Sequence, residues 1–289
     1  MSSPSFRLLL IRGLGHSGTT ILDLALGAHP QMIGLGEAVR VLQKPARGES
    51  QRGPAQLRGA LRHERLCTCG QVAAQCPVWG PVLDWLPAHD EEPLPVKLGY
   101  LLESLRRSKS TDSWSSPWVV ESFQDDFVLP LLEDSAVEVR VIHLTRDVRS
   151  WVHSRAREGR KKGAWLPGLR PLLRWWRLSA RHERLLRRSG KPVFQLGYEE
   201  LALDPEQALR RVCVWLGLEF HDEMLQPLLY STSHILSGNR MRFDSSKGRA
   251  IRYDAAWMGA SSGVAQLALL FPLLSKLNQR LVYSASRQR

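Results

Sequence analysis

The segment from Gly13 to Thr20 carries residue types that bind phosphate or sulfate groups. It reads Gly-Leu-Gly-His-Ser-Gly-Thr-Thr and joins an apolar run, Phe6 to Ile11, to a stretch with helical spacing of apolar residues, Ile21 to Leu26. Glycines let the backbone approach an anion closely, and N–H groups at the start of a helix donate hydrogen bonds to it. The order strand, glycine-rich loop, helix therefore predicts a phosphate-binding loop.

Three interpretations of this loop are open. Gly13, Gly15 and Gly18 satisfy G-x-G-x-x-G, and Glu37 follows nineteen residues later, which is the spacing of a dinucleotide site in an NAD(P)-dependent oxidoreductase. The outer two glycines also fit a nucleotide triphosphatase loop, but Thr19 stands where the phosphate-binding Lys belongs. In the third interpretation, Gly15-His16-Ser17 begins the nucleophile elbow of a hydrolase, but Thr19 stands where the closing glycine of that motif belongs.

The missing lysine favours a ligand with less charge than a triphosphate. A nucleotide triphosphatase needs that Lys to offset the charge of the terminal phosphates. A sulfuryl group on a 5′-phosphate carries one negative charge fewer, so backbone amides, hydroxyls and a helix N-terminus can hold it without magnesium. The loop is therefore compatible with a sulfuryl donor that is held without a metal ion.

Four segments follow one another along the chain: Gly15 to Thr20 with Gly36-Glu37, Val141 to Ser154, Leu196 to Leu201, and His234 to Trp257. Together they resemble the sulfotransferases that use 3′-phosphoadenylyl sulfate (PAPS). The first resembles the loop around the 5′-phosphosulfate. The second is similar to the family's 3′-phosphate signature, an Arg at a strand end and a Ser eight residues later. The last two resemble the landmark whose Tyr contacts the nucleotide and the C-terminal nucleotide loop of the bacterial branch.

The resemblance implies a role for each candidate site residue and implies 3′,5′-ADP as the product of the donor. Glu37 is the expected general base, since an acid at this place has that role in related branches that carry Gly-Glu. The expected nucleotide contacts are Gly15, His16, Ser17, Gly18, Thr19 and Thr20 to the 5′-phosphosulfate, Arg146 and Ser154 to the 3′-phosphate, Tyr198 near the adenine, and Lys247 or Arg249 closing over the nucleotide. Arg146 can present a guanidinium fork to phosphate, and Ser154 can add a hydroxyl donor.

Two positions depart from the family pattern. His16 replaces a Lys or Arg of the phosphosulfate loop, and Gln124 replaces a Lys that many relatives carry after the third strand. A permanent cation thus becomes a group that titrates near neutral pH. We expect His16 to act in catalysis in its charged form, so that activity falls as it deprotonates.

Apolar runs and helical spacing alternate along the chain, which predicts an α/β fold of three layers, a mainly parallel sheet flanked by helices and P-loop-like. The expected strands are Phe6 to Ile11, Gln31 to Leu35, Trp118 to Glu121, Val137 to Leu144 and Pro192 to Leu196. The expected helices include Val96 to Arg107, Asp126 to Leu132, Leu169 to Arg188, one between Asp204 and Gly217, and a buried pair around Val264 to Leu274. We expect one domain, residues 1–289, in which residues 40–117 and 155–190 are acceptor-side insertions or lids.

The net charge of +12 is concentrated between Arg155 and Lys191, a segment that contains 13 Lys and Arg but only two acidic residues. One cationic face attracts phosphate, sulfate, polyanions or an anionic membrane. A polyanion or nucleic-acid binding module on residues 155–191 is therefore an alternative function. The simplest interpretation of this amphipathic segment is that its apolar side packs on the core. The functional alternatives are that residues 155–190 form a lid over the acceptor or a peripheral membrane contact.

Cys67, Cys69 and Cys76, with His63 four residues before them, offer three thiols and an imidazole. This donor set could hold structural zinc, although the spacing is not a standard one, and buried thiols are the simpler interpretation. The nucleotide and catalytic site, by contrast, is expected to need no metal. The chain shows no signal-peptide core, so a cytoplasmic location is expected. The expected partner is an acceptor, whether small molecule, glycan or peptide, and no specific nucleic acid; the sequence leaves the oligomeric state open.

Overall fold

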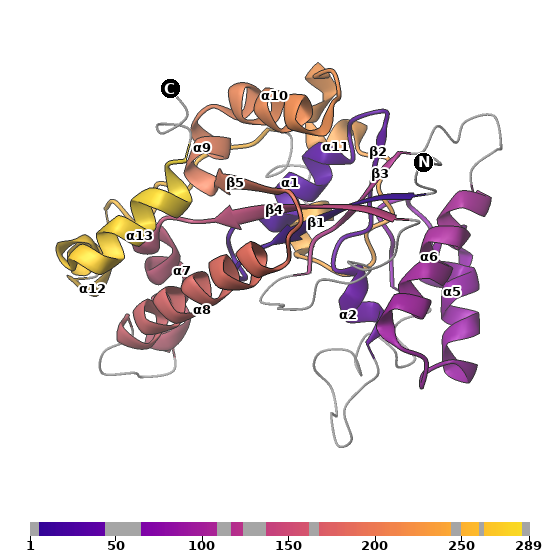
Figure 1. Ribbon diagram of the computed structural model, residues 1–289, viewed down its shortest axis with the longest axis horizontal. Helices are drawn as coiled ribbons and strands as arrows, with labels where there is room; N and C mark the ends of the chain where they lie inside the picture. Colours follow the sequence, from indigo (N-terminus) through magenta and orange to yellow (C-terminus); the bar gives the residue numbers. More distant parts are fainter. Residues whose placement is uncertain are drawn as a thin grey trace.

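Five parallel strands form the central sheet of the computed structural model (Figure 1), which describes residues 6–43, 65–108, 117–123, 137–161, 168–243, 250–259 and 263–284. The strands are β1 (Phe6–Arg12), β2 (Met32–Gly34), β3 (Trp118–Glu121), β4 (Val137–Thr145) and β5 (Val193–Gly197). Their order in the sheet is β2-β3-β1-β4-β5. The central strand β1 reads as a continuous apolar run because helices cover both faces of a parallel sheet. All five expected strands are confirmed to within two residues at each end.

Helices follow or precede each strand. They are α1 (Thr19–Leu26), α2 (Ala38–Leu42), α5 (Trp79–Trp85), α6 (Leu94–Ser108), α7 (Val148–Lys161), α8 (Leu169–Arg188), α9 (Tyr198–Leu203), α10 (Pro205–Leu216), α11 (Pro227–Tyr230), α12 (Gly263–Leu267) and α13 (Pro272–Val282). The expected helix at 126–132 lies outside the described residues. The helix between Asp204 and Gly217 is confirmed: Asp204 Oδ1 accepts the N–H of Gln207 at 3.1 Å, and Gly217 ends α10 with a φ of 74°.

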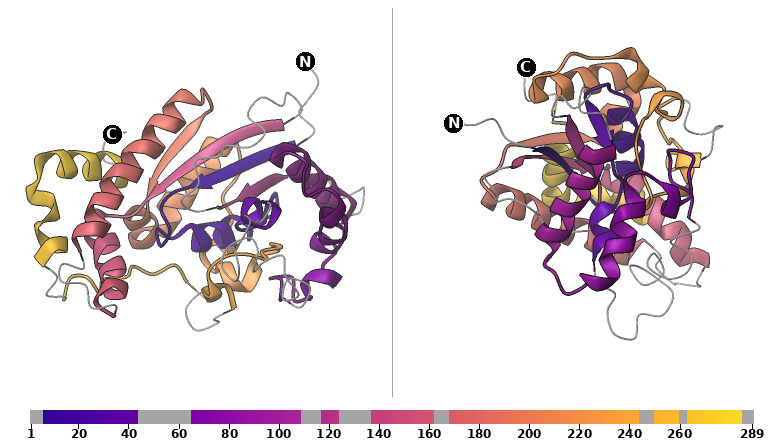
Figure 2. Two further views of the ribbon diagram at one scale, coloured as in Figure 1. Left: turned by 90° about the horizontal axis from the view of Figure 1, so that it is seen from below. Right: turned by 90° about the vertical axis from the view of Figure 1, so that its right-hand side faces the viewer.

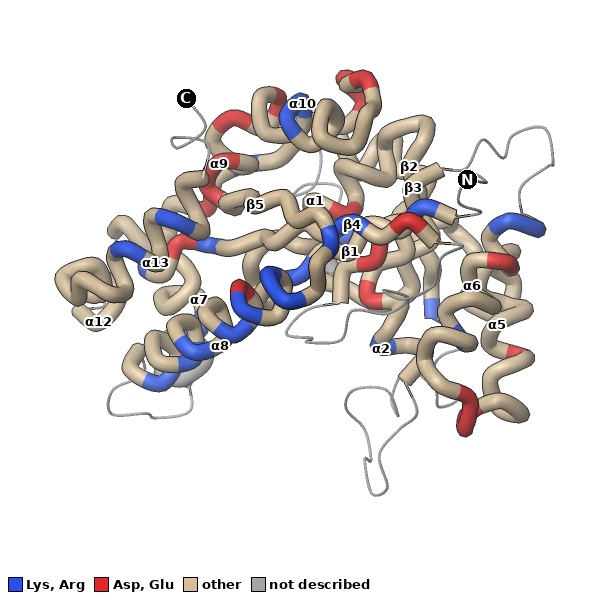
Figure 3. Tube along the Cα trace, viewed as in Figure 1, with Lys and Arg blue, Asp and Glu red and all other residues tan. Residues whose placement is uncertain are grey.

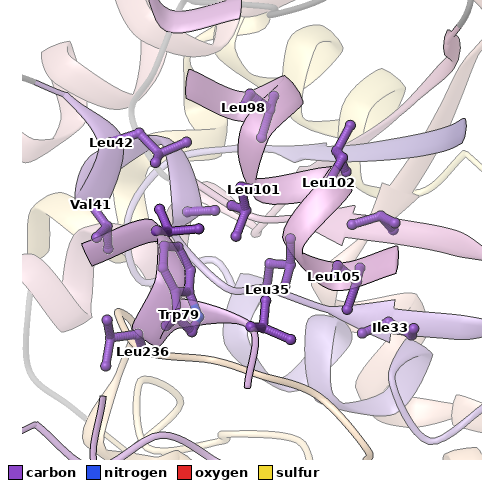
Figure 4. Packing of buried hydrophobic residues seen from close by; sticks show 14 of the residues in the cluster. Ile33, Leu35, Val41, Leu42, Trp79, Leu98, Leu101, Leu102, Leu105 and Leu236 are labelled. Atoms are coloured by element: carbon purple, nitrogen blue, oxygen red, sulfur yellow. The ribbon is translucent and has the colours of Figure 1, made fainter. Parts of the chain in front are cut away.

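One face of the sheet packs on α2, α5 and α6. Leu8 and Leu10 of β1 point to this side and meet Trp79 and Leu98 in one buried cluster. Figure 4 shows that Leu236, from a far later segment, closes the cluster beside Trp79. Part of the expected insertion at 40–117 is therefore one of the fold's own layers.

The opposite face packs on α1, α9 and α10. Leu9 and Ile11 of β1 point to it and join Ile142 of β4 and Leu209 of α10. Burial of alternate residues of one strand on two faces gives the three-layer arrangement that the sequence predicts.

A third cluster lies at the end of the molecule opposite α5 and α6, where α7, α8, α12 and α13 meet (Figures 1 and 2). Trp175 of α8 is fully buried there and donates from Nε1 to the carbonyl of Arg146 at 3.0 Å. The C-terminal helix pair exists, but the expectation that it is buried was wrong at its turn, where Leu270 is 73% and Leu273 70% exposed. Apolar composition did not reveal which side of the pair meets the core.

Candidate functional site

A cavity of about 400 Å³ opens beyond the carboxyl ends of β1 and β4. This is where parallel α/β sheets bind ligands. Its lining comes from six separate segments: His16, Gly18, Thr19, Thr20, Ile21, Glu37, Arg40, Arg146, Tyr198, Gly238, Asn239, Ala250, Ile251 and Arg252. Three arginines against one glutamate make this lining cationic, which suits an anionic ligand.

The glycine-rich loop ends directly at the start of α1. Gly18 has a φ of 92°, and a Cβ there would lie 2.6 Å from the ring of Tyr198, so glycine is required by both conformation and space. The first N–H groups of α1 have no acceptor within the helix and no side chain caps it. Thr19 Oγ1 is buried and has no hydrogen-bond partner among the described residues. This unsatisfied hydroxyl beside a helix N-terminus fits an anion in the cavity.

Arg146 follows β4 directly, lines the cavity and contacts the loop. Its Nε donates to Ser150 Oγ at 2.8 Å, one terminal nitrogen to the carbonyl of His16 at 3.1 Å, and the other to Asp254 Oδ2 at 2.9 Å. The guanidinium carbon also lies 4.8 Å from the centre of the Tyr198 ring. Four segments therefore fix the orientation of one guanidinium at the phosphate loop.

A buried polar network supports Arg146 from behind. Glu199 of α9 accepts the N–H of Asp147 at 2.9 Å and the hydroxyl of Ser150 at 3.0 Å, and Ser150 in turn holds Arg146. Burial raises the pKa of Glu199 to about 7. This network could not be predicted from the sequence, because a Glu that follows a strand is ordinarily exposed to solvent.

Glu37 stands at the N-terminal end of α2 and lines the cavity. Its Oε2 accepts a hydrogen bond from Arg40 at 2.9 Å and another from Ser237 Oγ at 3.2 Å. Its N–H donates to the carbonyl of Ser237 at 3.0 Å. The carboxylate is thus held in place and within reach of a ligand in the cavity.

His16 is exposed at the mouth of the loop, with a φ of 72°. Its Nε2 lies 3.0 Å from a terminal nitrogen of Arg155 on α7. Arginine only donates hydrogen bonds, so Nε2 of His16 is the acceptor, as in a neutral ring. Arg155 brings a permanent charge to this point. That activity falls as His16 deprotonates stays a prediction.

The structure brings together Glu37, Arg146, Tyr198 and the loop, but not every expected residue. Ser154 lies half-buried on α7 and does not line the cavity; Ser150, one turn earlier, holds Arg146 instead. Gly15 and Ser17 belong to the loop without facing the cavity. Lys247, Arg249, Gln124 and His63 lie outside the described residues.

Two cavity residues, Arg40 and Arg252, were not singled out from the sequence. Arg40 and Arg252 carry no pattern that separates them from surface arginines. Asn239 and Asp254 belong to the C-terminal segment that resembles a nucleotide loop, and that resemblance was the available signal. Their contacts to Thr20 and Arg146 join positions 219 and 108 residues apart.

The basic segment forms a separate surface. Figure 3 shows Lys and Arg along α8, and the exposed side chains include Arg174, Arg177 and Arg181, none of which lines the cavity. The opposite side of α8 packs into the third cluster through Leu172 and Trp175. Core packing of one side of this helix is confirmed.

A sequence model described as the sulfotransferase family matches residues 9–222, which is most of the 289-residue chain and includes the loop, Glu37, Arg146 and Tyr198. The chain belongs to the sulfotransferase family. The resemblance drawn from the four segments is confirmed at this level, and the enzyme class is that of a transferase.

Two solved structures share the fold of this sulfotransferase. The sulfotransferase domain from the Synechococcus PCC 7002 olefin synthase has 18% sequence identity and a TM-score of 0.58, with 96% of this chain and 95% of that chain covered. The sulfotransferase domain from the curacin biosynthetic pathway also has 18% identity, with a TM-score of 0.56 and 98% and 99% covered. No curated protein matches the sequence. Among the described residues, no helix has the length and apolar character to cross a membrane.

Proposed function

We propose that this sulfotransferase moves a sulfuryl group from PAPS to a hydroxyl or amine of its acceptor. The observation that carries the proposal is the meeting of Arg146 with the glycine-rich loop in one cationic cavity. The loop suits a 5′-phosphosulfate and the guanidinium suits a phosphate elsewhere on the same nucleotide. A donor with phosphate at both its 3′ and 5′ positions matches both features.

The donor's charge is offset by groups of this chain. The N–H groups at the start of α1 and the unsatisfied Thr19 hydroxyl face the 5′ end of the nucleotide, and Arg155 with His16 stands at the loop's mouth. Because the transferred sulfuryl group carries less charge than a terminal phosphate, the proposal gives no step to a metal ion.

Glu37 is the proposed general base. The acceptor oxygen or nitrogen attacks the sulfur in line with the bridging oxygen, whose bond to sulfur breaks as 3′,5′-ADP leaves. The acceptor's proton passes to a carboxylate oxygen of Glu37. Arg40 and Ser237 hold the carboxylate through Oε2 and so orient it toward the cavity.

The acceptor is proposed as a small molecule, glycan or peptide that enters beside Glu37. An NAD(P)-dependent oxidoreductase would also use the glycines and Glu37, but it would not explain why Arg146 lies at the loop. A nucleic-acid binding module on α8 would not explain the cavity.

Calorimetry tests the donor site. We expect 3′,5′-ADP to bind about 10- to 100-fold more tightly than AMP, since a charge-assisted hydrogen bond contributes about 1.5–3 kcal/mol. Arg146→Gln should remove this preference, and the control Arg177→Gln, on the exposed side of α8, should keep it. Equal binding of 3′,5′-ADP and AMP by the unchanged protein, or tighter binding of NAD, would refute the proposal.

A further inference from the structure

Three thiols and one imidazole meet at a point outside the nucleotide cavity. Cys76 Sγ lies 3.8 Å from the sulfur of Cys67, 3.8 Å from that of Cys69 and 3.4 Å from Nδ1 of His234. All four atoms lie within 4.8 Å of one another. Three of the residues come from one loop and the fourth from a segment 158 residues later.

The three distances from Cys76 fit a single tetrahedral ion. With Zn–S bonds of about 2.3 Å and a Zn–N bond of about 2.0–2.1 Å, a tetrahedron places two sulfurs about 3.8 Å apart and a sulfur and nitrogen about 3.6 Å apart. A disulfide needs about 2.05 Å between sulfurs, so the geometry is that of thiols around a common centre. Soft sulfur donors with one imidazole select zinc over magnesium or calcium.

The backbone is arranged for charged sulfur. The N–H of Cys69 faces the sulfur of Cys67, that of Gln71 faces Cys69, and that of Trp79 lies 3.5 Å from Cys76. The loop turns at Gly70, whose φ is 87°, and is closed by the bridge between Leu66 and Val72. N–H groups aimed at ligand atoms are the outer hydrogen bonds that orient and stabilise metal ligands.

We infer that Cys67, Cys69, Cys76 and His234 bind one structural Zn²⁺ ion. Four protein ligands complete a tetrahedron and leave no position for substrate, so the ion has a structural role. His234 supplies the imidazole that the sequence interpretation assigned to His63. The inference stands on this geometry and is independent of the donor and acceptor proposed above.

The ion would join the cysteine loop to a wall of the cavity. Thr68 Oγ1 donates to the carbonyl of Ser233 at 2.6 Å, and Trp79 Nε1 donates to the carbonyl of His234 at 2.6 Å. Three residues after His234, Ser237 holds both the N–H and the carboxylate of Glu37. A bound metal therefore fixes the segment that positions the proposed base.

Metal analysis of the full-length protein, purified without chelator or a histidine tag, tests the inference. We expect stoichiometric zinc. Cys69→Ala should reduce the zinc content to background, because Cys69 is the exposed ligand and its loss leaves the packed interior in place. The control Cys213→Ala, a buried thiol in a different cluster, should keep zinc.

A second pair of variants identifies the imidazole. His234→Gln should lose zinc and His63→Gln should keep it. Three results would each overturn the assignment. They are zinc lost in His63→Gln but kept in His234→Gln, zinc retained in Cys69→Ala, and iron found in place of zinc.

Cobalt substitution in the unchanged protein gives a readout that needs no variant. Co²⁺ incorporated during growth should show the intense visible bands of a tetrahedral thiolate site and should protect the thiols from alkylation. Protein that takes up neither metal, with Cys67, Cys69 and Cys76 all alkylated in the folded state, would refute the site.

Discussion

Arg146 shows how a single side chain is prepared for an anion. Ser150, the carbonyl of His16 and Asp254 each accept one of its hydrogen bonds. The first two acceptors are neutral, whereas the Asp254 side chain is charged and 52% exposed. A phosphate that reaches Arg146 therefore competes with a carboxylate that can turn away into solvent.

Asp254→Asn should tighten binding of 3′,5′-ADP. The change removes both the competing charge and its repulsion of the phosphate, and an exposed ion pair contributes about 0–1 kcal/mol, so the gain should be up to about fivefold. Calorimetry measures it, with Asp222→Asn on the exposed surface as control. Weaker binding in Asp254→Asn would show that the carboxylate helps the ligand.

Glu37→Gln should separate catalysis from binding. A general base contributes about 10²- to 10⁴-fold to turnover, so sulfuryl transfer should fall by that factor while 3′,5′-ADP affinity stays within about twofold. Initial rates with labelled donor give the first quantity and calorimetry the second. Glu206→Gln, an exposed residue of α10, is the matched control, and unchanged turnover in Glu37→Gln would remove it from the mechanism.

At the scale of elements, the contact between α9 and α7 positions Arg146. Glu199 of α9 accepts the N–H of Asp147, which precedes α7, and the hydroxyl of Ser150 on α7. One buried carboxyl thus joins α9 to the start of α7. Buried polar networks of this kind fix a single arrangement when every member is satisfied.

Glu199 should make stability depend on pH. Burial raises its pKa from 4.5 to about 7, so the folded state holds a proton that the unfolded state releases across this window. The free energy of unfolding should therefore fall as pH rises from 4.5 to 7, by about 3 kcal/mol for a shift of that size. The stability contribution is fully present below pH 4.5 and lost by the time pH passes 7.

Urea unfolding across this pH range measures the effect. Glu199→Gln mimics the protonated carboxyl, so its curve should lack this part of the slope. Parallel curves for the two proteins would contradict the assignment.

At the scale of the whole molecule, charge is divided between two places. Arg40, Arg146 and Arg252 line the cavity, and a larger set of arginines, whose side chains are exposed, lies along α8. Figure 3 shows the position of these arginines along the helix. Neither set shares a residue with the other. A surface of one sign attracts oppositely charged molecules at low ionic strength, whatever the cavity binds.

Replacing Arg174, Arg177 and Arg181 together by Gln should therefore lower the salt concentration at which the protein leaves a heparin column. Binding of 3′,5′-ADP should stay within about twofold, because screening leaves little long-range interaction between exposed charges beyond about 10 Å. The pair Arg106→Gln and Arg107→Gln on α6 is the control. A parallel loss of nucleotide binding would place α8 in the nucleotide site.

The sequence alone determined the strands, the phosphate loop and the position of Arg146 after β4. These features depend on neighbouring residues: an apolar run forms a strand that both layers bury, and glycines before a helix leave N–H groups for an anion. Features that depend only on neighbouring residues can be predicted without knowing how the rest of the chain folds.

Only the tertiary structure decided which distant side chains meet. His234 rather than a neighbour of the cysteine loop faces Cys76, Asp254 rather than solvent faces Arg146, and Arg155 reaches His16, across 158, 108 and 139 residues. No periodicity connects such positions. They come together because the segments after the strands all turn over the same edge of the sheet, where packing determines each partner.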